Sequence, residues 1–168
     1  MVESSPGPRL TETAPAAALV MALGDPAVVE QFLVDRHGLP LPPVGKRIER
    51  PGRSILFVAP GKWLVLDHHG SDGFVALLTE GLQGIAAVTD QSDGLRTFRI
   101  SGKGAAERLQ NCVAVDLHPA RFRRGSAMAT MIGLMRVHLS RIDDEPTYEL
   151  SVARSLADNL ITHIGTEA

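Results

Sequence analysis

Apolar residues in the first half of the chain gather in two continuous runs, Ser54–Val58 and Trp63–Leu66. Pro60 and Gly61 lie between them, and proline followed by glycine is the signature of a type II turn. Because neither run alternates with polar residues, both are typical of central strands that are covered on two faces. The pattern therefore predicts a buried hairpin.

In the second half, apolar and polar residues alternate as they do in half-buried strands. Leu134–Ile142 and Tyr148–Val152 both alternate, with a polar turn at Asp143–Pro146 between them. We expect these two strands to pair as a hairpin. Single strands are further predicted over 84–90, 95–100 and 126–132.

Helical spacing marks the remaining segments. Asp25 and Pro26 resemble an N-cap followed by a first helical residue, and Gly38 lies where a left-handed C-cap is expected. Further helices are predicted over Ala16–Leu23, from a Ser71-Asp72 cap to Gly81, from a Ser101 cap through Leu109, and over Leu156–Ile164.

This order of elements predicts an α+β fold: two similar strand–helix–strand subdomains of mainly antiparallel sheets with helices packed on them. Residues 1–15 are rich in Ser, Pro, Glu and Thr and predict a flexible tail. We expect residues 16–168 to form one domain, with subdomains at 16–89 and 90–168. The halves suggest a duplicated unit, although no repeat of residues is evident.

Composition narrows the class of protein. An apolar fraction of 44% is typical of a globular chain, whereas a net charge of −2 and 4% aromatic residues argue against nucleic-acid binding. No apolar run approaches the roughly 20 residues that span a bilayer. One cysteine allows no internal disulfide, and the N-terminus lacks a signal pattern, so we expect a cytoplasmic protein without membrane contact.

A glycine turn, Gly102-Lys103-Gly104, follows a predicted strand and opens a predicted helix. A dinucleotide fingerprint needs a third glycine three residues later, where Glu107 stands, and the lysine-Ser/Thr pair of a P-loop is absent. We favour a tight turn over a nucleotide site.

For the other potentially reactive side chains, we prefer a structural or surface role over a catalytic or metal-binding one. We expect a solvated loop at His68-His69 rather than a metal site, and an exposed or interface position for His138. Cys112 is expected to be a small buried residue. Charged groups that we assign to surface loops are Arg121, Arg123, Arg124, Asp143, Asp144 and Glu145. The sequence therefore predicts no catalytic residue and no metal site.

Several motifs match known families in order and spacing. The pieces Asp90–Ser92, Phe98–Gly102, Ala105–Leu109 and Val115-Asp116 resemble the aminomethyltransferase (glycine-cleavage T-protein) family. Within it, the chain is most similar to the gamma subunits of heterotetrameric sarcosine oxidases, through Pro60–Val65, Cys112, Asp116–Pro119 and Arg154–Asp158. The resemblance covers about two-thirds of the chain, from Ser54 to Ile164.

This resemblance implies a non-catalytic structural subunit with alpha, beta and delta subunits as partners. The complex demethylates sarcosine to glycine and yields hydrogen peroxide with formaldehyde or methylene-tetrahydrofolate. FAD, FMN, NAD and tetrahydrofolate are implied for the partner subunits, and no cofactor for this chain. The alternatives are a self-sufficient folate-binding protein of this fold and a gamma-type subunit of a related enzyme such as N-methylglutamate dehydrogenase.

Asp116 is the one candidate remnant of a folate site that the resemblance offers. Folate-handling members have Asn-Asp at this place, whereas this chain has Val115-Asp116, so part of the polar recognition is lost. An aspartate that starts a turn before His118-Pro119 also needs no ligand. Both interpretations stay open here.

Overall fold

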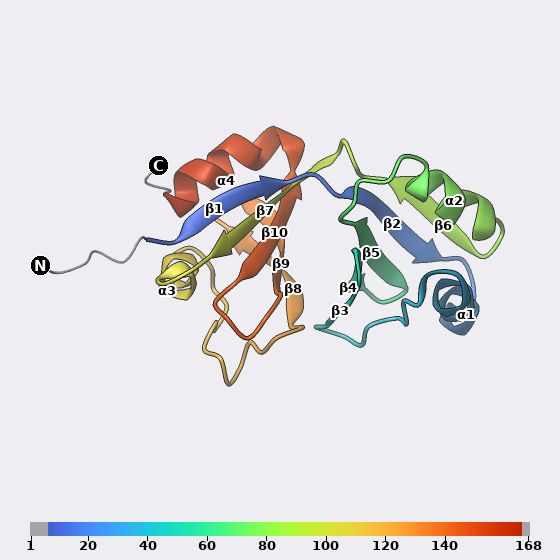
Figure 1. The fold of residues 1–168 in the computed structure, drawn as a ribbon, viewed down its shortest axis with the longest axis horizontal. Helices are drawn as coiled ribbons and strands as arrows, with labels where there is room; N and C mark the ends of the chain where they lie inside the picture. The colour runs from blue at the N-terminus through green and yellow to red at the C-terminus, as the bar shows by residue number, and fades with distance from the viewer. Residues whose placement is uncertain (1–6, 166–168) are drawn as a thin grey trace, which may run out of the picture. The chain divides into compact units, whose positions relative to one another are not determined.

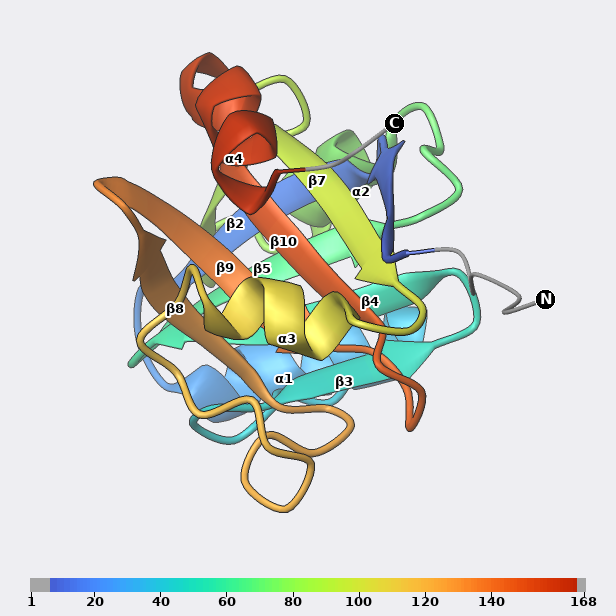
Figure 2. The ribbon, with the colours of Figure 1, turned by 90° about the vertical axis from the view of Figure 1, so that its left-hand side faces the viewer.

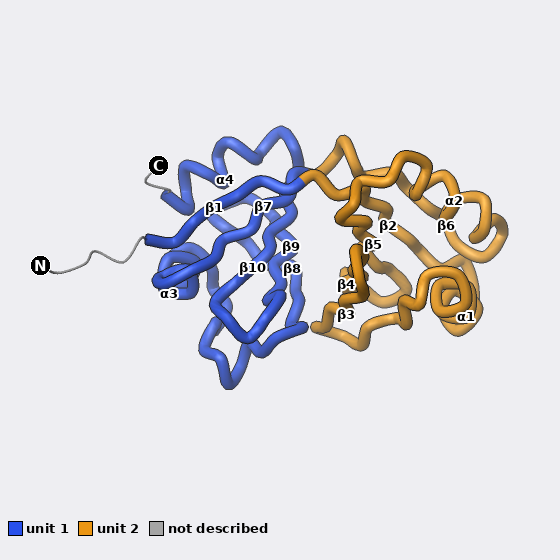
Figure 3. Tube along the Cα trace, in the orientation of Figure 1, with its two compact units in different colours: residues 1–13, 96–168 blue, residues 14–95 orange. Residues whose placement is uncertain are grey.

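A computed structural model describes residues 7–165. The chain divides into two compact units, coloured in Figure 3. Unit 2 is continuous, from Ala14 to Leu95, and unit 1 combines the N-terminal segment that ends at Thr13 with the chain from Arg96 onward. Each unit contains a five-stranded antiparallel sheet with helices, so the predicted α+β class is confirmed (Figure 1).

Unit 2 contains a sheet in the order β3-β4-β5-β2-β6, together with helices α1 and α2. Its core lies between the helices and one face of the sheet, where Leu33 and Leu78 from the helices meet Val65 from the central strand. Its elements are β2 (Ala16–Ala22), α1 (Pro26–His37), β3 (Arg47–Arg50), β4 (Arg53–Ala59), β5 (Lys62–Asp67), α2 (Phe74–Gly81) and β6 (Ala86–Asp90).

In unit 2, the predicted caps of α1 and the predicted turn between β4 and β5 are both present. Asp25 caps α1 by accepting a hydrogen bond from the Ala27 N–H at 2.9 Å, and Gly38 ends the helix in the left-handed conformation (φ 65°). Gly61 has φ 69° in the turn between β4 and β5, as proline followed by glycine predicts.

Unit 1 contains a sheet in the order β1-β7-β10-β9-β8. Figure 2 shows α3 and α4 against one face of this sheet, where Leu109 and Leu160 pack on Phe98 and Leu150. Its elements are β1 (Arg9–Thr13), β7 (Leu95–Ser101), α3 (Ala105–Gln110), β8 (Ala127–Ile132), β9 (Met135–Arg141), β10 (Tyr148–Ala153), a 3-10 turn (Arg154–Leu156) and α4 (Ala157–Ile164).

The predicted second hairpin forms with Tyr148 opposite Arg141 and Val152 opposite Val137. The apolar residues of β9 and β10 face the helices. The alternating polar residues of β10 are buried as well, with Glu149 and Ser151 each 2% exposed. Alternation therefore identified both strands but not the burial of their second face.

Two predicted segments have a different structure. Ala16–Leu23 is not a helix, because Ala16–Ala22 forms β2 between β5 and β6, where strand pairing overrides the helix preference of its alanines. The tail predicted over residues 1–15 contains β1, since Arg9–Thr13 pairs with β7. Residues 1–6 lie outside the described part.

The predicted boundaries and caps also change. The units meet after residues 13 and 95, rather than at the expected subdomain boundary after residue 89. Gly73 occupies the N-cap of α2 in place of the expected Ser71-Asp72 cap, and Gly104 occupies that of α3 in place of Ser101. Both glycines have positive φ, so the chain enters each helix through a left-handed turn that side-chain caps do not favour.

Candidate functional site

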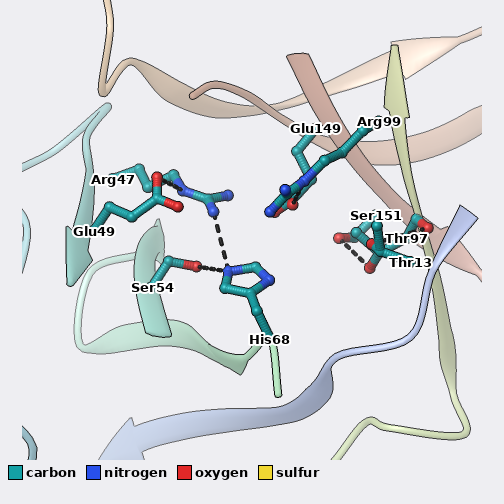
Figure 4. A network of polar contacts seen from close by, with 9 residues as sticks. All are labelled: Thr13, Arg47, Glu49, Ser54, His68, Thr97, Arg99, Glu149 and Ser151. Carbon is teal, nitrogen blue, oxygen red and sulfur yellow. Dashed lines mark hydrogen bonds and ion pairs between the residues drawn. The ribbon is translucent and has the colours of Figure 1, made fainter. Parts of the chain in front are cut away.

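Polar side chains form pairs on the face of the unit 1 sheet that points away from α3 and α4. Thr97 Oγ1 lies 2.9 Å from Ser151 Oγ, and Arg99 Nε donates to Glu149 Oε2 at 2.9 Å (Figure 4). These residues come from the neighbouring strands β7 and β10 and alternate with core residues such as Phe98. The pairs therefore make a polar band across the middle of the sheet.

Burial explains why this band is paired. Glu149 is only 2% exposed. A buried carboxylate without a partner would lower the free energy of unfolding by roughly several kcal/mol. The Arg99 guanidinium compensates that cost through its charge and its hydrogen bond. This band was not predicted from the sequence, where its signal is the Thr-x-Arg of β7 and the complementary Glu-x-Ser of β10.

His138 extends the polar band on β9, where it lies opposite Ser151. It is half-buried, and burial lowers the pKa of its imidazole below the ordinary value, with a smaller effect from the charge of Arg136. The expected exposed or interface position is therefore only partly met. A neutral imidazole here can donate one hydrogen bond and accept one.

Unit 2 has a polar cluster of its own around His68. Ser54 Oγ lies 2.9 Å from His68 Nε2, and Arg47 Nη2 lies 3.3 Å from the same nitrogen. Arg47 Nε pairs with Glu49 Oε2 at 3.5 Å. Ser54 and Arg47 are buried, so these contacts, drawn in Figure 4, are shielded from solvent.

The expectation of a solvated loop at His68-His69 is therefore correct for one residue only. His69 is exposed, whereas His68 is half-buried and bonds within the cluster. Among the described residues, no group of three or more His, Cys, Asp or Glu side chains has the arrangement of a metal site.

The glycine turn before α3 has the geometry of a tight turn. Gly102 and Gly104 have φ of 92° and 86°, which L-residues with a side chain rarely adopt. α3 spans only six residues, Ala105–Gln110. The two glycines are thus explained by backbone conformation without a bound phosphate.

Asp116 lies in a loop beside a shallow surface hollow of about 530 Å³. Its Oδ1 accepts a hydrogen bond from the His118 N–H at 2.9 Å, as in an Asx turn. Gln110 fixes the same loop by accepting from the Leu117 N–H at 2.9 Å. The geometry accounts for Asp116 as a turn residue, and its role toward folate stays a prediction.

The remaining candidates are held by local contacts. Cys112 is half-buried, and burial raises the pKa of its thiol while the charge of Arg108 opposes the shift. In the basic loop, Arg123 Nε donates to Ala120 O at 3.2 Å and Arg124 Nη1 lies 3.7 Å from Asp144 Oδ2. Within residues 7–165, no helix is long and apolar enough to cross a membrane.

Comparison with known proteins shows the family. Residues 20–166 match the model of the sarcosine oxidase gamma subunit family. The chain belongs to this family. The resemblance drawn from the motifs is thereby confirmed, and it extends to the N-terminal third, where the motifs gave no help. No curated protein sequence matches the chain.

Solved structures show the same fold. A chain of the heterotetrameric sarcosine oxidase from Corynebacterium sp. U-96 matches with a TM-score of 0.82 at 21% identity, covering 96% of this chain and 87% of that one. The glycine cleavage system aminomethyltransferase T from Bartonella henselae matches with a TM-score of 0.68 at 13% identity. This gamma-family chain spans 46% of that aminomethyltransferase. The predicted aminomethyltransferase-type fold is confirmed.

Proposed function

We propose that this chain is a non-catalytic gamma subunit of a heterotetrameric, flavin-dependent sarcosine oxidase. The family match over residues 20–166 carries the proposal, and the fold shared with a chain of the Corynebacterium oxidase supports it. In this assignment, alpha, beta and delta subunits are the partners. FAD, FMN, NAD and tetrahydrofolate are bound by those partners, which demethylate sarcosine to glycine.

The state of the polar groups supports a structural role. Arg99 and Glu149 are paired with each other, as are Thr97 and Ser151, so these groups stabilise the sheet. Asp116 accepts a hydrogen bond within its own turn. A binding site for a small ligand would instead direct several such groups into one concave pocket.

Co-expression tests the proposal. The full chain with an affinity tag would be produced alone and together with the alpha, beta and delta subunits encoded in the same genome. We expect the untagged subunits to co-purify in a yellow complex that forms hydrogen peroxide from sarcosine, and the lone chain to be colourless. A tagged chain that stays a stable monomer and retains no subunit when all four are co-expressed contradicts the proposal.

A folate-binding protein that acts alone is the second candidate, because the aminomethyltransferase fold is shared. Trp63, which is 4% exposed, provides a fluorescence signal in unit 2. Under the main proposal, titration of the lone chain with tetrahydrofolate gives no saturable change. Saturable binding would favour the second candidate. The other alternative, a subunit of a related N-methylglutamate dehydrogenase, is tested by supplying the complex with N-methylglutamate in place of sarcosine.

A further inference from the structure

One edge of the unit 2 sheet is formed by β6, which pairs on its other side with β2. Gln91 N–H donates to Ala17 O at 2.7 Å, and this bond fixes which residues of β6 bond to β2. Because antiparallel pairing alternates, Ala87 and Thr89 point their backbone groups toward β2, whereas Val88 points its N–H and C=O away. Among the described residues, none bonds to the backbone of Val88.

A groove of about 690 Å³ runs along this edge, between α2 and β6. Figure 1 shows α2 lying beside β6. Apolar side chains form part of the groove, and its two charged residues, Glu80 and Asp90, are both acidic and exposed. The lining residues, all from unit 2, are Val75, Ala76, Thr79, Glu80, Gln83, Val88 and Asp90.

The other sheet edges carry more features that prevent strand addition than β6 does. Natural proteins protect edges with charged residues, prolines, bulges or covering segments. β1 contains Arg9 and Glu12, β3 consists mainly of Arg and Glu, and β8 is covered at its end by a bridge from Val113. β6 has the sequence Ala-Ala-Val-Thr-Asp, with a regular register and its one charge at the end.

We propose that this groove receives an extended segment of another oxidase subunit, which adds as a strand beside β6. The segment would bond to the Val88 backbone, place apolar side chains against Val75 and Ala76, and direct a Lys or Arg toward Glu80 and Asp90. Main-chain bonds supply affinity in this mode of recognition, and side-chain pockets and charge supply specificity. The inference rests on the proposed function, which provides the partner.

Val88→Pro tests the added strand directly. Proline removes the outward N–H without breaking a bond to β2, and edge positions of this kind tolerate proline. Ala129→Pro in β8 is the matched control, because the bond from Arg141 N–H to Ser126 O at 2.9 Å shows that Ala129 also points its N–H away from its neighbour. Thermal unfolding of each lone variant shows whether it folds.

Glu80→Arg tests the charge without changing the backbone. Glu80 is exposed on α2, so the reversal leaves the unit 2 core intact. Glu107→Arg, on an exposed position of α3, is the control. We expect the wild-type chain to lose partner subunits as salt is raised, since a pairing of exposed charges is screened.

The measurement is the amount of alpha, beta and delta subunit retained by the tagged full chain after co-expression. We expect Val88→Pro and Glu80→Arg each to reduce retention at least about tenfold, and both controls to retain wild-type amounts. If wild type and Val88→Pro retain equal amounts, the groove is not the docking site, while the proposed function stands. Loss in Ala129→Pro but not in Val88→Pro also overturns it. A wild-type chain that retains no subunit overturns the proposed function itself.

Discussion

His138 illustrates how burial changes the chemistry of a single residue. The sequence places it on the polar face of an alternating strand, where an exposed histidine would titrate normally. In the structure it is half-buried opposite Ser151, and burial lowers the pKa of the imidazole, with Arg136 adding to the shift. The folded state therefore favours the neutral form.

This shift predicts a loss of stability on mild acidification. The unfolded histidine, with its pKa near 6.5, binds a proton more readily than the folded one. The contribution of His138 is therefore fully present above that pH and decreases as the pH falls below it. We expect His138→Gln to flatten the dependence of unfolding free energy on pH between about pH 7.5 and 5.5, measured by urea denaturation.

His69→Gln is the control, because His69 is an exposed histidine in unit 2. It should leave the slope close to that of the wild type. An unchanged slope in His138→Gln would show that the burial of this imidazole does not affect stability.

At the scale of one element, α1 shows that a helix end depends on backbone geometry as much as on residue type. Asp25 lies in an extended conformation and accepts a hydrogen bond from the Ala27 N–H. Asp72 also precedes a helix, but the left-handed Gly73 follows it and α2 has no side-chain cap. The same residue type is therefore a cap in one place and not in the other.

This difference predicts unequal effects of the same substitution. We expect Asp25→Ala to lower the free energy of unfolding by about 1 kcal/mol, because an N–H group at the start of α1 loses its acceptor. Asp72→Ala should change it by less than about 0.5 kcal/mol, as is usual for surface positions. Urea denaturation of both variants measures the two changes in the free energy of unfolding. Equal losses would contradict the capping assignment.

At the scale of the whole molecule, the N-terminal strand completes a unit whose other strands begin at residue 95. β1 pairs with β7, and Leu10 packs against the unit 1 core. Glu12 accepts two hydrogen bonds from Arg96, each of 2.7 Å. Because Arg96 and Glu12 are partly exposed, the apolar contact and the strand pairing are expected to contribute more than the ion pair.

Removal of β1 should therefore destabilise unit 1. For a chain that starts at Ala14, we expect a loss of about 2 kcal/mol, or roughly 5 °C in Tm, because β7 loses its neighbour and Leu10 is absent. A chain that starts at Gly7 keeps β1 and serves as the control. Hydrogen exchange at the amides of Phe98 and Ile100 locates the effect. Unchanged exchange and Tm would show that β1 contributes nothing to unit 1.

The sequence alone determined the features that depend on neighbours along the chain. The Asp25 cap, the left-handed Gly38 and the Pro60-Gly61 turn each act within a few residues, so their signals predicted α1 and the β4–β5 hairpin. Hydrophobic alternation predicted the β9–β10 hairpin for the same reason. The ordered motifs from Ser54 onward were specific enough to indicate the family.

Tertiary structure decided the features that depend on distant residues. The alanine-rich Ala16–Ala22 favours a helix locally, but pairing with β5 and β6 makes it a strand. β1 finds its partner 84 residues away, as the bond between Glu12 and Arg96 shows, and no local pattern encodes that distance. The buried polar band has the same cause, since only the pairing of β7 with β10 brings Arg99 to Glu149.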